Sequence, residues 1–163
     1  MKPQIPPFGD GVVLLRPIAE ADLETTLAWR NRDDARIWFK TSDVLSLDQH
    51  RGWFRAYLAK SDDLHFIVER DGKLVGQAAV YRCRDGRAEI GRFLVAPEAA
   101  GSGAMARACS ALLEFCARPP LSLKSVYLEV FAHNERALDL YRRLGFHESG
   151  REGGLLRMER DLA

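Results

Sequence analysis

The chain has 163 residues, of which 29% are charged, and its 24 Lys and Arg residues nearly balance its 23 Asp and Glu residues. This length is typical of one domain with a buried core, so we expect residues 1–163 to form a single domain. The balanced charge gives no support for a nucleic-acid or membrane-surface protein, and no apolar run approaches the roughly 20 residues of a membrane span.

The first half of the chain predicts a mixture of helices and antiparallel strands. The elements expected in chain order are a strand over 11–18, helices over 20–30 and 46–59, and strands over 64–70, 73–81 and 87–96. Pro17 ends the first strand, and Ser46 is a suitable N-cap for the second helix. The dipeptide Asp71-Gly72 is a strong two-residue turn signal, so the last three strands are expected to form a meander.

The second half predicts alternating helices and strands. These are a helix over about 102–117, a strand over 123–131, a helix over 134–145 and a strand over 155–162. Because residues 87–131 read as strand, helix and strand, the two strands should be parallel, with a right-handed crossover between them. The fold class expected is mixed α/β, with a mostly antiparallel twisted sheet and helices on both faces. Its edge strands are compatible with a homodimer.

The cysteines and the N-terminus indicate a reducing compartment. Cys83, Cys109 and Cys116 form no CxxC pair, and an odd count does not suit a disulfide framework. Cys109 and Cys116 are seven residues apart on one helical face, so buried thiols are expected. No His/Cys pair has metal-ligand spacing, so no metal is predicted. The opening residues, MKPQIPPFGD, lack the apolar core of a signal peptide, and we expect a cytoplasmic protein.

Two closely spaced glycines precede the third helix. The stretch VAPEAAGSGAMARACSALLEF, residues 95–115, leads from a strand into a helix through Gly101 and Gly103. Such a turn presents bare backbone N–H groups at the positive end of a helix dipole, which suits a phosphate group. A plain turn without a ligand fits the same residues. The loop is neither a Walker motif nor a dinucleotide fingerprint, because no Gly-Lys-Ser/Thr and no third glycine follow.

This loop and a second motif resemble the GNAT superfamily of acetyl-coenzyme A-dependent N-acetyltransferases. The cofactor motif of that family, V-x-P-x-x-[QR]-G-x-G-x-[GA], aligns with VAPEAAGSGAM at residues 95–105. The second motif, N-x-x-A-x-x-L-Y-x-x-x-G-F, is matched at every fixed position by residues 134–146. The resemblance implies a GNAT-like fold and direct transfer of an acetyl group from acetyl-coenzyme A (acetyl-CoA) to a primary amine.

The resemblance also implies which residues hold coenzyme A. They are Leu94, Val95, Ala100, Gly101, Ser102, Gly103, Ala104, Met105 and Asn134. Ala100 departs from the usual Gln or Arg, and Met105 departs from the usual small residue. Because backbone N–H groups make most of the phosphate contacts in this motif, we expect binding to survive, in a weaker form. Arg107 is either a further source of charge or a solvated helix residue.

The chemistry requires a neutral amine, a donor for the thioester oxygen and a proton for the departing thiolate. An amine with a pKa of about 10.4 is almost entirely protonated at pH 7, so a base helps, and Glu89 is the candidate. A cross-strand partner for Arg or Lys is the other interpretation of Glu89. The family resemblance implies that Tyr141 donates the proton, although its helical spacing also fits the core. The oxygen would be received by a backbone N–H near Leu94 and Val95. His50, His65 and His133 are further titratable candidates.

The acceptor is expected to lie against the first two helices. Residues 29–54 contain all three tryptophans, which can form core or a stacking wall for a ring. This stretch resembles the amino-sugar branch of the family, which implies that Trp38, Phe39 and His50 line a pocket for a nucleotide-linked amino sugar. An N-terminal α-amine of a ribosomal protein is one alternative, and a non-catalytic coenzyme A-binding protein is another. Aspartates interleave with the arginines here, so a nucleic-acid stripe is not expected.

Overall fold

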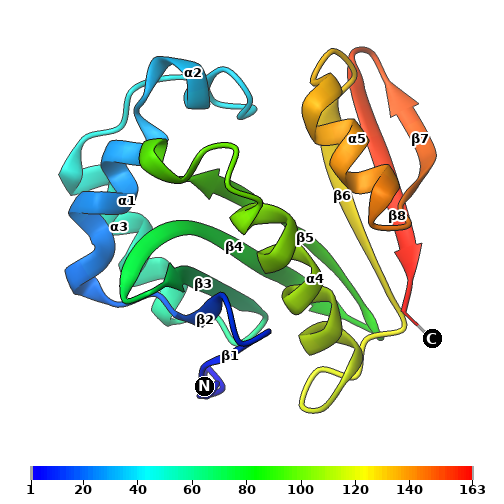
Figure 1. The fold of residues 1–163 in the computed structure, drawn as a ribbon, viewed down its shortest axis with the longest axis horizontal. Helices are drawn as coiled ribbons and strands as arrows, with labels where there is room; N and C mark the ends of the chain where they lie inside the picture. The colour runs from blue at the N-terminus through cyan, green and yellow to red at the C-terminus, as the bar shows by residue number, and fades with distance from the viewer. Residues whose placement is uncertain (1, 163) are drawn as a thin grey trace.

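Eight strands form one twisted sheet in the order β1-β2-β3-β4-β5-β6-β8-β7 (Figure 1). The computed structural model describes residues 2–162. The strands are Phe8–Gly9 (β1), Leu14–Pro17 (β2), Asp63–Arg70 (β3), Lys73–Arg84 (β4), Arg87–Val95 (β5), Ser125–Phe131 (β6), His147–Glu152 (β7) and Leu155–Asp161 (β8). The helices are Glu20–Asp22 (η1), Leu23–Arg30 (α1), Asp33–Arg36 (α2), Leu47–Leu58 (α3), Pro97–Ala99 (η2), Ala104–Ala117 (α4) and Glu135–Arg143 (α5).

The predicted meander and the parallel crossover are confirmed. β3, β4 and β5 pair antiparallel in sequence order, and β3 turns into β4 at Asp71-Gly72. β5 and β6 pair in parallel, and α4 connects them. Ser46 caps α3 as predicted, because its hydroxyl accepts a hydrogen bond from the Gln49 N–H at 3.1 Å.

Two predictions about strands are wrong. The expected strand over 11–18 is shorter and begins at Leu14, because Asp10 Oδ1 accepts hydrogen bonds from the N–H groups of Val12 and Val13, each at 2.8 Å, and reverses the chain there. This turn creates the two-residue strand β1. The sequence analysis also missed β7, whose residues HESGRE show no apolar alternation because this edge strand buries none of its side chains.

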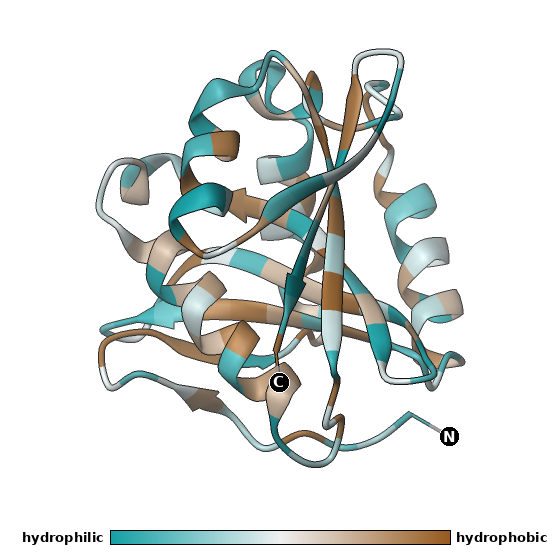
Figure 2. Ribbon diagram, turned by 90° about the vertical axis from the view of Figure 1, so that its right-hand side faces the viewer, coloured by the Kyte–Doolittle hydropathy of each residue, from teal (hydrophilic) through white to brown (hydrophobic). Residues whose placement is uncertain are grey.

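Helices cover both faces of the sheet and thereby divide the core in two. The larger cluster contains Leu112 and Phe115 of α4 and Leu138 of α5, so these two helices share one face. The smaller cluster joins Phe54 and Tyr57 of α3 to the other face. In Figure 2 hydrophobic residues run along the strands in the middle of the molecule, while the helices alternate hydrophobic and hydrophilic patches. No helix within residues 2–162 is long and apolar enough to cross a membrane.

β5 and β6 separate soon after they meet, and this opening is named here the fork. The register pairs only residues 87–89 with residues 125–127, and beyond them the β6-facing edge of β5 has no partner strand (Figure 1). On its other edge β5 carries a bulge, because Arg92 and Phe93 lie opposite the single residue Ala78 of β4. Arg92 has a φ of 58°, which a bulge accommodates. The sheet therefore offers an unpaired backbone edge in the middle of the molecule.

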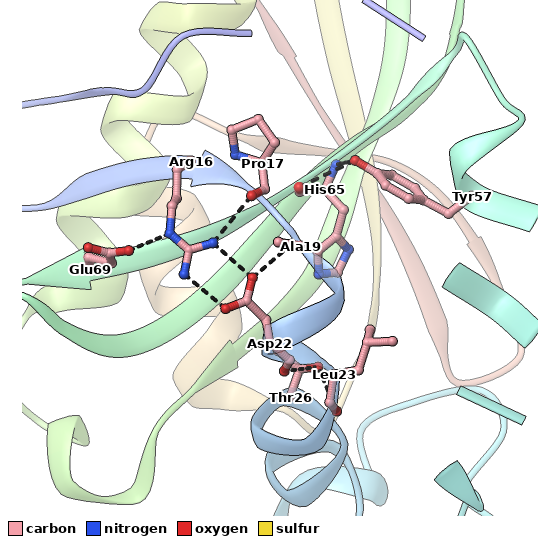
Figure 3. A network of polar contacts seen from close by, with 9 residues as sticks. All are labelled: Arg16, Pro17, Ala19, Asp22, Leu23, Thr26, Tyr57, His65 and Glu69. Carbon is pink, nitrogen blue, oxygen red and sulfur yellow. Dashed lines mark hydrogen bonds and ion pairs between the residues drawn. The ribbon is translucent and has the colours of Figure 1, made fainter. Parts of the chain in front are cut away.

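A buried ion pair anchors the start of α1. Arg16 of β2 lies between Glu69 of β3 and Asp22 of η1, as Figure 3 shows. Asp22 is buried, and its carboxylate also accepts a hydrogen bond from the Ala19 N–H at 2.8 Å. Because all its polar atoms have partners, this buried carboxylate fixes where α1 leaves the sheet.

Candidate active site

The glycine loop at the start of α4 presents several free backbone N–H groups, and the loop with these groups is named here the cradle. Gly101 and Gly103 have φ angles of 76° and 80°, a region that side chains other than glycine rarely adopt. Within residues 2–162, the N–H groups of Gly101, Gly103, Met105 and Ala106 donate to no acceptor. The first turn of α4 begins only with the bond from the Arg107 N–H to the Gly103 carbonyl. This arrangement is an anion site at the positive end of a 14-residue helix.

The side chains of the loop leave the cradle open. Ala100 is exposed, and no atom lies within 4 Å of an ideal Cβ built at Gly101 or Gly103. The Ser102 hydroxyl donates to the Ala99 carbonyl at 2.6 Å, which folds it back onto the loop. Met105, the departure from the family motif, points toward the sheet, because its Cε would be 3.2 Å from a Cβ at Gly76 of β4. The two unusual residues therefore leave the N–H groups unobstructed.

Arg107 does not stand free beside the cradle. Its guanidinium forms an ion pair with Asp10 at 2.9 Å, and hydrogen bonds from two backbone N–H groups, with this ion pair, lower the pKa of Asp10 to about 2. Arg107 also lines a cavity of about 340 Å³ between α4 and α5 together with Arg143. Because Asp10 neutralises Arg107 and also lines this cavity, Arg143 is the arginine that would add positive charge for a phosphate here.

Tyr141 lies at the fork, on the face that α4 and α5 share. Its ring centroid is 6.0 Å from that of Phe93 on β5 and 6.0 Å from that of Phe146. The residue is 8% exposed, and its hydroxyl makes no hydrogen bond within the described chain. Burial raises the pKa of Tyr141, so the hydroxyl keeps its proton at physiological pH. The structure thus places a protonated donor without a partner at the opening between the strands.

Glu89 lies on the opposite face, at the point where the fork begins. Its carboxylate forms an ion pair with Arg82 and accepts a hydrogen bond from the Tyr81 hydroxyl at 3.3 Å. Burial, followed by the charge of Glu89, raises the pKa of Tyr81, so that hydroxyl is a donor. The cross-strand ion pair that the sequence allowed is therefore present. A role for Glu89 as a base stays a prediction.

Two of the three expected acceptor residues lie together and the third lies apart. Trp38 packs near His133, with ring centroids 5.1 Å apart, and Phe39 follows it beneath the Arg30 guanidinium. His50 instead stacks on Trp53 at 5.4 Å, and its Nε2 is 3.0 Å from the Thr26 hydroxyl. Burial, followed by the charge of Arg30, lowers the pKa of His50. His50 thus belongs to the packing of α1 on α3, whereas Trp38 borders the fork.

Asn134 has the capping role that its position predicted. Its Oδ1 accepts a hydrogen bond from the Ala137 N–H at 3.3 Å. The amide nitrogen of the same side chain makes no hydrogen bond within residues 2–162. This nitrogen is therefore available for a second contact at the end of β6. A role of Asn134 in binding coenzyme A stays a prediction.

Several charged residues escaped the sequence analysis on the sheet face that carries Glu89 and is covered by α3, named here the acceptor face because the acceptor is expected there. Arg92 forms a bidentate ion pair with buried Asp63, at 2.8 and 2.9 Å. Its guanidinium also lies 4.2 Å from the Tyr81 ring centroid. On β6, Glu129 forms an ion pair with Lys40 at 2.7 Å, although the two residues are 89 positions apart in the sequence. No local pattern indicates these two pairs, because one depends on the bulge at Arg92 and the other on a long loop.

His65 is buried beneath this face without a hydrogen-bond partner for either ring nitrogen within the described residues. It is 3% exposed and contacts the Trp53 ring edge-on at 5.1 Å. Burial, followed by the nearby charge of Arg92, lowers its pKa from 6.5 to about 3. A neutral histidine in this place packs α3 onto the sheet and is not a general base near pH 7.

This burial makes the fold sensitive to acid. Because the folded-state pKa of His65 lies below its unfolded value, the free energy of unfolding should fall by about 1.4 kcal/mol per pH unit from about pH 6.5 toward pH 3. We expect His65→Leu to flatten this slope in urea titrations between pH 7 and 4, compared with wild type. The matched variant His147→Leu, at an exposed position of β7, should keep the wild-type slope. Equal slopes in all three proteins would contradict this account.

The thiols and the carboxylates give no metal centre. Burial raises the pKa of Cys109 and Cys116 to about 12, as expected for inert core thiols. No group of three or more His, Cys, Asp or Glu side chains within residues 2–162 is arranged to hold a metal ion.

Comparison with known proteins identifies the motifs at the cradle and the fork. The acetyltransferase (GNAT) family matches residues 23–146, which include the cradle, the fork and Tyr141. Spermidine N(1)-acetyltransferase of Escherichia coli (strain K12) is 28% identical over 141 residues, covering 85% of this chain and 74% of that protein. The resemblance predicted from the two sequence motifs is therefore confirmed.

Solved structures confirm the predicted fold class. The spermidine N-acetyltransferase from Vibrio cholerae, in complex with CoA and spermine, superposes with a TM-score of 0.84 at 22% identity, covering 94% of this chain and 97% of that one. A ribosomal L7/L12 alpha-N-protein acetyltransferase in complex with coenzyme A gives a TM-score of 0.80 at 14% identity, with coverage of 93% and 95%. The N-acetyltransferase PseH from Campylobacter jejuni gives 0.74 at 15% identity, with coverage of 93% and 99%.

Proposed function

Because the chain belongs to the acetyltransferase (GNAT) family of acetyl-CoA-dependent N-acetyltransferases, we propose that it acetylates the primary amine of a small molecule at the fork between β5 and β6. The observation that carries this proposal is the convergence of three features on one opening. The cradle lies at its α4 end, Tyr141 lies on one face, and Glu89 lies on the other. Together they supply an anion site, a proton donor and a carboxylate.

The free N–H groups of the cradle fit a pyrophosphate. Those of Gly101, Gly103, Met105 and Ala106 would hold it, with Arg143 contributing charge. The unpaired edge of β5 at Leu94 and Val95 would hold the extended arm of coenzyme A by backbone hydrogen bonds, and the amide of Asn134 would meet it from the other side. Acetyl-CoA supplies the activated acetyl thioester.

Tyr141 and the β5 backbone would complete the transfer. A backbone N–H near Leu94 and Val95, freed by the divergence of β6, would receive the thioester oxygen as it gains negative charge. The Tyr141 hydroxyl, which lies beside Phe93 of β5 at the fork and has no partner within the described chain, would give a proton to the departing sulfur. The reaction thereby proceeds by direct attack, with both substrates bound.

Glu89 would take up the proton that the amine loses, and a pH profile tests this role. We expect Glu89→Gln to lower kcat/KM about 100-fold and to remove the limb on which activity rises with pH. The matched variant Arg82→Gln breaks the same ion pair but keeps the carboxylate, so it should retain that limb. If both variants keep the wild-type profile, Glu89 is a structural partner of Arg82 alone.

The acceptor proposed first is a nucleotide-linked amino sugar. Trp38 and Phe39 offer aromatic surfaces beside the fork, which suit the face of a sugar or a base. The Arg30 guanidinium adds a buried nitrogen, Nη1, that has no partner within the described chain and suits an anionic group. These observations favour an acceptor that combines an amine with a ring and a negative charge.

A polyamine is the second candidate. It is favoured by the similarity to the spermidine N(1)-acetyltransferase of Escherichia coli. The buried carboxylates of the acceptor face weigh against it, because Asp63 and Glu89 are each neutralised by an arginine. A polycation gains less from paired carboxylates than from free ones.

A panel of amines distinguishes these acceptors. Thiol release from acetyl-CoA would be followed with UDP- and TDP-linked amino sugars, spermidine, aminoglycosides and peptides with a free N-terminus. We expect turnover on one small-molecule class and none on the peptides. Turnover only on peptides would support a protein α-amine as acceptor. The absence of turnover on every class would contradict the proposal.

A further inference from the structure

A loop in the N-terminal half of the chain extends across the fork, and a lysine of this loop contacts β6. Residues 37–44, named here the crossing loop, follow α2 and contain no regular element before α3 begins at Leu47. Lys40 in this loop pairs with Glu129 of β6 at 2.7 Å. Among the described residues, this is the one ion pair that joins the α1–α3 segment to β6.

Glu129 faces the open part of the fork. The last pair between the two strands joins Glu89 to Tyr127, and side chains two residues apart on a strand point to the same face. Glu129 therefore lies on the acceptor face, one step beyond the last paired residues. Its side chain is 22% exposed, so it is partly removed from water yet still reachable. An amine that binds in the fork would therefore lie close to this carboxylate.

The crossing loop does not need Lys40 to hold its shape. The Asn31 side chain closes its base with two hydrogen bonds of 2.8 Å each: its Nδ2 donates to the Leu45 carbonyl, and its Oδ1 accepts from the Leu45 N–H. The Arg30 side chain donates to the Thr41 carbonyl, and the Arg36 side chain donates to the Ser42 carbonyl at 3.0 Å. The loop is thus fixed from its own side by α1 and α2. The contact between Lys40 and Glu129 is an addition to this support.

We propose that Glu129 binds the ammonium group of the acceptor, and that Lys40 occupies this position in the free enzyme. This inference rests on the proposed function. The Lys40 side chain carries a protonated primary alkylamine, the same group that the proposed acceptor carries. It contacts the carboxylate at the mouth of the fork, in the position proposed for the ammonium group of the acceptor. Its side chain is 61% exposed, and exposed ion pairs of this kind are weak, so an acceptor that also contacts Trp38 would displace it.

The proposal predicts opposite effects for the two partners of the pair. Lys40→Met removes the competing ammonium and keeps the length of the side chain, so the acceptor KM should fall about threefold with kcat unchanged. Glu129→Gln removes the binding carboxylate and should raise that KM at least about tenfold. In the Glu129→Gln background, Lys40→Met should have no further effect. Lys60→Met, at an exposed position after α3, is the matched control.

A structural tie between the loop and β6 would give a different pattern. In that case Lys40→Met and Glu129→Gln would both raise KM by a similar factor, and this result would overturn the proposal. The wild type and the four variants should also be titrated by calorimetry with spermidine and with a UDP-linked amino sugar in the presence of coenzyme A. This binding readout needs no turnover, so it distinguishes failure of the inference from failure of the proposed reaction. If neither probe binds the wild type or Lys40→Met, the inference is overturned as well.

Discussion

Replacing Tyr141 by Phe is expected to lower kcat about 100-fold or more while leaving the affinity for coenzyme A unchanged. The ring of Tyr141 packs on Phe93 and Phe146, and Phe keeps these contacts. The change therefore removes only the hydroxyl, which makes no hydrogen bond within the described chain. Because a departing thiolate then lacks its proton donor, the loss should appear in the chemical step. Pre-steady-state thiol release and calorimetry with coenzyme A measure the two quantities separately.

The matched control for this variant is Tyr127→Phe. The Tyr127 ring lies on β6 between the guanidinium groups of Arg87 and Arg157, at 4.5 and 4.4 Å from its centroid. Loss of its hydroxyl should leave kcat close to that of the wild type. If Tyr141→Phe also turns over at the wild-type rate, then Tyr141 is a core residue, as its helical spacing alone would allow.

Replacing Gly103 by Val should weaken coenzyme A binding about 10- to 100-fold. Gly103 has a φ of 80°, and a β-branched residue is strained there although its side chain would meet no atom within 4 Å. The backbone should relax away from this angle and turn N–H groups of the cradle from the phosphate. Each hydrogen bond to a charged group contributes about 1.5–3 kcal/mol, so losing one accounts for the expected change. Calorimetry with coenzyme A gives the dissociation constant.

Gly72→Val separates this effect from general instability. Gly72 has a φ of 75° in the hairpin between β3 and β4, and no atom lies within 4 Å of an ideal Cβ there. Its substitution should therefore impose comparable strain and a comparable drop in melting temperature, with unchanged affinity for coenzyme A. An equal affinity in Gly103→Val and Gly72→Val would show that the cradle does not hold the phosphate.

Much of the fold follows from local signals in the sequence. The Asp71-Gly72 turn, the Ser46 cap and the Asn134 cap each act within four residues, and each is present in the structure. β7 depends on pairing with β8 instead of on its own pattern, since none of its six residues is buried. The late start of the first predicted strand, at Leu14, also has a cause outside the strand pattern, because the Asp10 side chain competes for the backbone N–H groups that a longer strand would use.

The parts of the candidate site that lie within one short motif could be predicted from the sequence. The parts formed by segments far apart in the sequence could not. The cradle and Tyr141 each lie within a short motif, so the sequence places them. The pairing of Lys40 with Glu129 joins a loop to a strand 89 positions away, and no local pattern indicates it. The pair of Arg92 with Asp63 depends on a bulge that turns Arg92 onto the acceptor face. His50 was assigned to the pocket by resemblance, yet its contact with Thr26 ties it to helix packing.

The central claim is that the cradle at the start of α4 binds the phosphates of acetyl-CoA beside the fork. The most direct test is an amide proton–nitrogen NMR titration of the isotope-labelled protein with coenzyme A. We predict large downfield proton shifts at Gly101, Gly103, Met105 and Ala106, whose N–H groups have no acceptor within residues 2–162 of the free protein. Smaller shifts should follow along the open edge of β5. Saturable binding that leaves these four amides unmoved and shifts others would contradict the account.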